Sequence, residues 1–205
     1  MTPSPPSRTW SWVASTLELG ERREHARRLC GLELEAVRYI NLDYARFERP
    51  IHDGPRAITE AREWEKPTWQ WQSFDSVDYG VELLTDCSRV FSVAWDPPGP
   101  LQQGIGLREV PLLGTAISED TNVAVWDVTQ QSRWAAFVGT PISDVELDYE
   151  PWKQPEGFWC RRITLRFGGA RVEMILGDKG PGEELGPSAD SVAVLFFPAI
   201  GAASP

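Results

Sequence analysis

The chain has 205 residues, of which 41% are hydrophobic, and it contains 10 Trp, 8 Phe and 4 Tyr. This composition is typical of a folded globular protein and excludes a disordered one. The formal net charge is −10, from 30 acidic and 20 basic residues. An acidic surface is repelled by phosphate backbones and anionic lipid heads. We therefore expect no nucleic acid and no membrane as a partner, and a basic protein fits better.

Cysteine usage and the apolar pattern indicate a compartment. The stretch MTPSPPSRTWSWVAST at the N-terminus has no apolar run of signal-peptide character, and no segment approaches a membrane span. Cys30, Cys87 and Cys160 are an odd number without metal-ligand spacing, so we expect free thiols and a cytoplasmic protein. Arginine outnumbers lysine 17 to 3, which is associated with the coding bias of GC-rich bacteria.

The first third of the chain predicts a loose start followed by short helices. Residues 1–18 are rich in Pro and Ser and predict a loose N-terminal segment, in which Trp10 and Trp12 are candidates for anchoring. Residues 19–31 predict one short helix with a thin apolar stripe. A second helix is indicated at 56–65.

The rest of the chain reads as short strands that are rich in β-branched and aromatic residues. Tight hairpin turns are indicated at 85–89 and at Gly168-Gly169. Because no long helices separate the strands, the pattern argues against a parallel α/β sheet. We expect strands at 32–44, 80–84, 89–95, 122–128, 143–149, 159–167, 171–176 and 191–197.

Two hairpin segments match without gaps, VELLTDCSRVFSVAWD at 81–96 and ITLRFGGARVEMILGD at 163–178. The strands before and after each hairpin also match, so the order strand, hairpin, strand occurs twice, over about 31–128 and 139–197. Generic strand alternation could produce such matches by chance, but the ungapped agreement favours a duplication.

The duplication predicts the fold class. A small isolated sheet cannot cover its own apolar face, so the two halves should pack on each other. We expect an all-β protein, an antiparallel β-sandwich or half-open barrel built from two pseudo-repeats of about four strands each. One or two short helices would lie in the N-terminal third, and 19–200 would form a single β-rich domain.

The stretch SDVELDYEPW at 143–152 carries a carboxylate at every second position. Alternate side chains of a strand point to opposite faces, so Asp144, Glu146, Asp148 and Glu150 would share one exposed face. One interpretation is the solvated face of an edge strand, where like charge blocks aggregation. The other is a partner surface, because carboxylates about 7 Å apart fit a basic patch on another protein.

Ten tryptophans permit two interpretations. Tryptophans within strands suit the core, where a large aromatic ring packs well, namely Trp95, Trp126, Trp134 and Trp159. Tryptophans in connections either join that core or form an exposed platform for sugars, cations or partner side chains. The candidates for this partner-binding platform are Trp64, Trp69, Trp71 and Trp152.

Catalytic and cofactor motifs are missing from the sequence. The two histidines and the absence of Cys-x-x-Cys exclude a histidine-rich or cysteine-rich zinc site. There is no G-x-S-x-G, P-loop or G-x-G-x-x-G. GPLQQGIG at 99–106 reads as a solvent loop, and GDKGPGEELG at 177–186 does not fit an EF-hand. We therefore expect no cofactor and no metal.

These observations favour a non-catalytic cytoplasmic bacterial binding protein that holds a basic protein partner through an acidic face and exposed aromatics. In overall profile, though not in any motif, the chain is similar to the small acidic immunity proteins that neutralise secreted toxins. The alternative is a sugar- or small-ligand-binding β-sandwich, with hydrolase activity through a carboxylate pair as an extension.

Overall fold

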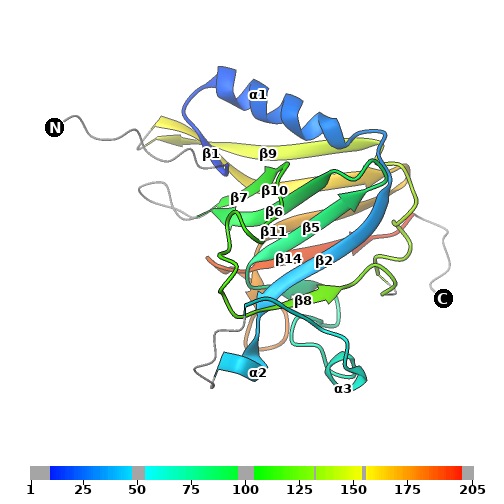
Figure 1. The fold of residues 1–205 in the computed structure, drawn as a ribbon. Coiled ribbons are helices and arrows are strands. Elements are labelled where there is room, and N and C mark those ends of the chain that lie inside the picture. Colours follow the sequence, from blue (N-terminus) through cyan, green and yellow to red (C-terminus); the bar gives the residue numbers. More distant parts are fainter. Residues whose placement is uncertain (1–9, 48–53, 97–103, 132, 154–155, 200–205) are drawn as a thin grey trace.

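A computed structural model describes residues 10–47, 54–96, 104–131, 133–153 and 156–199. In Figure 1, two β-sheets lie one behind the other, with a helix along their upper edge. Most of the described elements are strands, so the sandwich-like, mainly β architecture that the sequence predicts is confirmed. Within these residues, no helix is long and apolar enough to cross a membrane.

The front sheet has six strands in the described chain. All neighbours are antiparallel except β3 and β8. In spatial order the strands are β3 (Arg56–Ala57), β8 (Val123–Asp127), β2 (Leu34–Leu42), β5 (Gly80–Thr85), β6 (Val90–Asp96) and β7 (Gly104–Arg108).

The back sheet also has six strands in the described chain, and all of its pairs are antiparallel. A path of five runs through β9 (Asp144–Lys153), β10 (Glu156–Phe167), β11 (Ala170–Leu176), β14 (Val192–Phe197) and β4 (Asp75–Val77). The sixth strand is β1 (Trp12–Val13). It pairs with residues 158–159 of β10, whereas β11 pairs with residues 162–167 of the same strand. A separate small hairpin consists of β12 (Asp178–Lys179) and β13 (Leu185–Gly186).

One hydrophobic core joins the two sheets. Val37 and Leu83 of the front sheet and Leu165 and Val172 of the back sheet are all fully buried in a single cluster. Neither sheet could cover this apolar surface alone, which is why the two halves of the chain fold against each other. The largest fully buried side chains are Trp69, Trp134, Tyr39, Phe74, Phe91 and Phe137.

The helix expected at 19–31 is α1 (Thr16–Ala26), continued by the short 3₁₀ helix η1 (Arg27–Leu29). It begins at Ser15, whose hydroxyl accepts a hydrogen bond from the amide of Glu18 at 3.2 Å. α1 lies along β9 at the edge of the back sheet (Figure 1). The other described helices are short, α2 (Tyr44–Phe47) and α3 (Ala61–Trp64). The helix expected at 56–65 is thus reduced to α3, because Arg56 and Ala57 pair with β8 instead.

The N-terminal segment is more ordered than expected from Trp10 onward, whereas residues 1–9 lie outside the described chain. The carboxylate of Asp96 accepts hydrogen bonds from the amides of Trp10 and Ser11, the latter at 2.5 Å. β7 makes room for this segment, because a Cβ on Gly106 would lie 2.6 Å from Trp10 Cβ. The same requirement explains the glycines at alternate positions of β7. Residues 104–106, which were expected to be part of a solvent loop, thus belong to a strand.

Both predicted hairpins form, but their registers differ. In β5 and β6, Leu83 lies opposite Phe91, and three residues form the loop. In β10 and β11, Leu165 lies opposite Val172, and only two residues form the loop. The ungapped sequence match instead aligns Val90 with Val172, and Val90 is only half-buried.

The strands after the hairpins also differ in position. β14 pairs with β11, the second strand of its hairpin. β8 pairs with β2 on the opposite side of the front sheet, and β7 takes the place beside β6. Two pseudo-repeats are therefore not confirmed, although both halves contain a strand that pairs with the hairpin following it.

Candidate functional site

The acidic stretch forms the outer face of β9, which pairs with β10 alone among the described strands. Asp144 and Glu146 are exposed, and Asp148 and Glu150 are half-exposed. The predicted alternation is confirmed over 144–147, where Val145 and Leu147 are buried. Beyond these residues Tyr149 is only partly buried, although it packs against the core.

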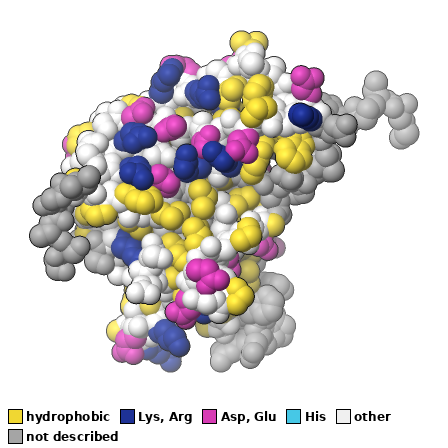
Figure 2. All heavy atoms as spheres, turned by 180° about the vertical axis from the view of Figure 1, so that it is seen from behind, with side chains coloured by type: hydrophobic (Ala, Val, Ile, Leu, Met, Phe, Trp, Pro, Cys, Tyr) yellow, Lys and Arg dark blue, Asp and Glu magenta, His cyan; other side chains and the backbone are white. Residues whose placement is uncertain are grey.

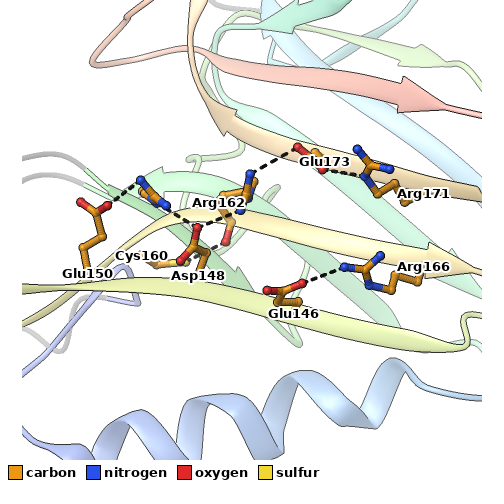
Figure 3. Close-up of polar contacts among 9 residues, drawn as sticks. Glu146, Asp148, Glu150, Cys160, Arg162, Arg166, Arg171 and Glu173 are labelled. Carbon is orange, nitrogen blue, oxygen red and sulfur yellow. Dashed lines mark hydrogen bonds and ion pairs between the residues drawn. The ribbon is translucent and has the colours of Figure 1, made fainter.

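Arginines of the neighbouring strand β10 lie beside the carboxylates of β9. In the antiparallel register, Asp148 lies opposite Arg162 and Asp144 lies opposite Arg166. Arg161 stands at an irregularity of this register between Cys160 and Arg162. Arg162 Nη2 donates to Asp148 Oδ2 at 3.0 Å (Figure 3). Arg161 Nε donates to the same oxygen at 2.8 Å.

The remaining carboxylates of β9 are paired as well. Arg166 Nη2 lies 3.1 Å from Glu146 Oε2, and its Nε lies 3.9 Å from Asp144 Oδ2. Arg161 Nη1 lies 2.5 Å from Glu150 Oε1. We call this set the arginine–carboxylate ladder, and its members are Asp144, Glu146, Asp148, Glu150, Arg161, Arg162 and Arg166.

The charge pairing continues onto β11. Glu173 accepts a hydrogen bond from Arg171 Nε at 2.7 Å, and Arg162 Nη1 lies 3.7 Å from its other oxygen. Thr164 lies opposite Glu173 and is only 3% exposed. The Arg171 guanidinium lies 4.0 Å from the centre of the Phe197 ring. Charged side chains therefore cover a continuous part of the outer face of the back sheet.

This pairing corrects the expectation of an unpaired acidic row. The sequence pattern places four carboxylates on one face, but β10 places arginines on that same face at matching spacing. Three guanidinium groups stand beside four carboxylates, so the ladder is close to neutral, and its cross-strand neighbours of opposite charge attract each other. The side chains of the Arg162 and Arg166 pairs remain partly exposed, so each of these pairs contributes about 0–1 kcal/mol to stability.

Three tryptophans gather on the same face at one end of the back sheet. Trp12 of β1 lies opposite Trp159 of β10, which in turn lies opposite Glu150 of β9. Trp152 is two residues further along β9 and shares the face of Glu150. All three tryptophans are half-exposed. Gly157 makes this packing possible, because a Cβ there would lie 2.5 Å from a ring atom of Trp12.

A cleft of about 530 Å³ lies next to these tryptophans, between the sheet and the connection that precedes β14. Figure 2 shows this side of the molecule, where hydrophobic side chains form a band beside a region of mixed positive and negative side chains. The cleft is lined by Trp159, Arg161, Arg162, Ile175, Leu176, Pro187, Ser188 and Ala189.

The connection tryptophans other than Trp152 do not join this face. Trp69 is 1% exposed, which contradicts its expected place in an exposed platform. Trp64 packs on the core and meets Trp126 edge-on at 4.9 Å between ring centres. Trp71 is half-buried, with the Lys179 ammonium 4.4 Å from its ring centre. The long connection folds back onto the aromatic core, so most of its aromatic surface is used for packing.

A buried polar cluster links the two sheets. Tyr39 of β2 donates from its hydroxyl to Asp75 Oδ2 of β4 at 2.7 Å, and Trp134 Nε1 donates to the same hydroxyl at 2.7 Å. Arg133 pairs with the other oxygen of Asp75 and donates to the carbonyl of Gln72 at 2.9 Å. Tyr39, Asp75 and Trp134 are almost fully buried, so this cluster connects the sheets within the core.

Burial controls the titration of the cluster. Desolvation raises the pKa of Asp75 to about 6, against the lowering effects of Arg133 and the Tyr39 hydroxyl. Burial, followed by the charge of Asp75, also raises the pKa of Tyr39 well above its usual value. Perturbed groups of this kind occur in catalytic sites and in structural networks alike. This cluster does not line the cleft beside Trp159, and Tyr39, Asp75 and Trp134 are almost fully buried, so we assign it a structural role.

Sequence reasoning identified the carboxylates and Trp152 but missed the arginines of β10. It wrongly placed Trp159 in the core, whereas this side chain is half-exposed on the outer face, and it considered Trp12 only as an anchor of the N-terminal segment. A signal was present, because Arg162 and Arg166 are four residues apart, as are Asp144 and Asp148. Recognising 144–167 as one long hairpin would have paired them. No protein family, curated protein or solved structure matches this chain.

Proposed function

We propose that this protein is a non-catalytic binding protein that holds a protein partner through the outer face of the back sheet. The supporting observation is that the half-exposed tryptophans of three neighbouring strands adjoin the arginine–carboxylate ladder. Tryptophan and arginine are the residues most enriched at the centres of protein interfaces. Partner-facing residues on this proposal are Trp12, Trp152, Trp159, Arg161 and the carboxylates of β9.

The net charge of the whole chain supports a basic partner, because it acts at long range. The ladder is nearly neutral, but the whole chain carries −10. A net charge of this size accelerates the approach of a basic partner, and salt weakens the effect. We therefore retain a basic protein as the partner, attracted by the whole molecule and held at the tryptophans. The three unpaired cysteines fit a reducing compartment, so the proposal places this binding in the cytoplasm.

A photo-crosslinking amino acid tests the surface. It replaces Trp152 in one variant and Tyr44 in the control, because Tyr44 is also aromatic and is 52% exposed, on α2. Crosslinking in cells of the source organism, followed by mass spectrometry, should give a defined protein adduct at position 152 and none at position 44. Equal adducts at both positions, or none at position 152, would contradict the proposal.

Purified components then measure affinity for the partner found in this way. Trp152→Ala should weaken binding at least about tenfold, because truncating an interface tryptophan commonly removes more than about 1.4 kcal/mol. Tyr44→Ala should change affinity less than about twofold. An unchanged affinity in Trp152→Ala, with the melting temperature preserved, rules out the tryptophan end of the sheet as the binding surface.

A further inference from the structure

The cleft beside Trp159 has the size and lining of a small-molecule site. Its volume of about 530 Å³ falls within the range of about 300–1,000 Å³ that ligand sites occupy. Trp159, Ile175 and Leu176 give it an apolar wall, and Pro187 and Ala189 give it a second one. A ligand between these walls would bury part of its apolar surface.

The charged groups that line the cleft have one sign. Arg161 and Arg162 are among its lining residues, and no acidic side chain is among those that the structure describes there. The carboxylates that hold these arginines come from neighbouring strands. Asp148 of β9 contacts both of them, and Glu173 of β11 lies 3.7 Å from Arg162. The two guanidinium groups are thus fixed from outside the cleft, as in a prearranged anion site.

Arg162 retains hydrogen-bonding capacity. Its side chain carries five N–H donors. Within the described residues it donates one hydrogen bond, to Asp148 at 3.0 Å, and its Nε has no acceptor. A buried donor without an acceptor is unfavourable, because it has lost its hydrogen bonds to water and gained none in the protein. A ligand oxygen that draws the guanidinium toward the cleft would relieve part of this penalty.

From this geometry we infer that the cleft binds a small amphipathic organic carboxylate, with its aromatic or aliphatic body on Trp159 and Ile175 and its carboxylate on Arg161 and Arg162. The two guanidinium groups disfavour a cation. A multiply charged phosphate would lose hydration against the apolar walls. This site goes beyond the proposed protein-binding function and does not depend on it.

Calorimetry on the full-length protein tests the inference with three probes of one shape, 3-phenylpropionate, 3-phenylpropanamide and 3-phenylpropylamine. The carboxylate should bind at least about tenfold more tightly than the amide, because a charge-assisted contact to arginine contributes about 1.4 kcal/mol or more. The amine should not bind. Equal binding of carboxylate and amide, or no binding of the carboxylate at concentrations up to about 10 mM, overturns the inference.

Two pairs of variants locate the binding. Arg162→Gln should weaken 3-phenylpropionate at least about tenfold, but it also disturbs the ladder. Ala189→Glu avoids this problem, because Ala189 is exposed and lies on the opposite wall. Its carboxylate should repel the probe and weaken binding about fivefold or more, whereas the isosteric Ala189→Gln should change it less than about twofold. Equal effects of Glu and Gln at this position would refute the site even if the probe binds elsewhere.

Discussion

Carboxylates pair with arginines in two regions of this molecule, and the surroundings of the pairs differ. In the arginine–carboxylate ladder, Asp148 is 22% exposed and its two arginines are 47% and 38% exposed. In the buried cluster, Asp75 is 2% exposed and Arg133 is 21% exposed. The same chemical pair is therefore solvated in one region and desolvated in the other.

Because of this difference, the two kinds of pair contribute differently to stability. A solvated pair gains little from its Coulomb energy, because water screens it and ordering the side chains reduces entropy. A buried pair interacts more strongly, but each ion has lost its hydration, which is why the pKa of Asp75 is raised despite a contacting guanidinium. We expect removal of one partner to be tolerated in the ladder and poorly tolerated in the cluster.

The largest effect is expected from Arg133→Met. This change leaves Asp75 buried without its cation and should lower the free energy of unfolding by about 3–5 kcal/mol at pH 7.5. The matched control is Arg166→Met in the ladder, where the expected loss is under about 1 kcal/mol. Urea denaturation measures both variants. Similar losses in the two would show that burial does not distinguish these regions.

A second effect concerns pH. The carboxyl of Asp75 has a pKa of about 6 in the folded protein against 3.8 in an unfolded chain. Between these values the native state binds more protons than the unfolded state, so the stability contributed by this group falls as pH rises from about 4 to 6. Relative to Asp75→Asn, the wild type should lose roughly 3 kcal/mol between pH 3.5 and 7. A stability difference between the two proteins that stays constant over this range contradicts the raised pKa.

A third and smaller effect is expected within the ladder. Asp148→Lys places an ammonium group beside Arg161 and Arg162 and should lower the free energy of unfolding by about 1–2 kcal/mol. Asp148→Asn removes the charge but keeps hydrogen-bonding atoms. It should therefore lower the free energy of unfolding by about 0.5 kcal/mol or less, as is usual for exposed pairs. Thermal and urea unfolding provide the comparison. If both variants are equally stable, the proximity of the guanidinium groups has no energetic consequence.

Much of the fold followed from local pattern. Alternation of apolar and polar residues located eight strands, and Gly168, with a φ of +63°, marks the predicted hairpin turn. The candidate site was harder, because it depends on the register of β9 and β10, which shifts by one residue between Cys160 and Arg162. One residue changes which side chains share a face, and alternation within a single strand does not contain that information.

Contacts between distant segments could not be predicted either, because they depend on where the connections pack. Trp12 meets Trp159 only because the N-terminal segment is held against β10, with Asp96 accepting from the amide of Ser11. Trp69 is buried because its connection folds back on Tyr39 and Trp126, with ring centres 5.0 and 5.8 Å away. No local propensity predicts where a connection packs.

The smallest expected effect is the coupling of one exposed pair. Glu146 and Arg166 lie 3.1 Å apart and are 50% and 43% exposed. A double-mutant cycle of Glu146→Gln and Arg166→Gln should give a coupling free energy of about 0.5 kcal/mol in 20 mM salt. In 1 M NaCl the Debye length is about 3 Å, so the coupling should fall close to zero. The loss caused by Arg133→Met should persist at that salt concentration, because solvent ions do not enter the core. A coupling that survives 1 M NaCl would mean that the ladder is desolvated and that the two regions do not differ as their exposed fractions indicate.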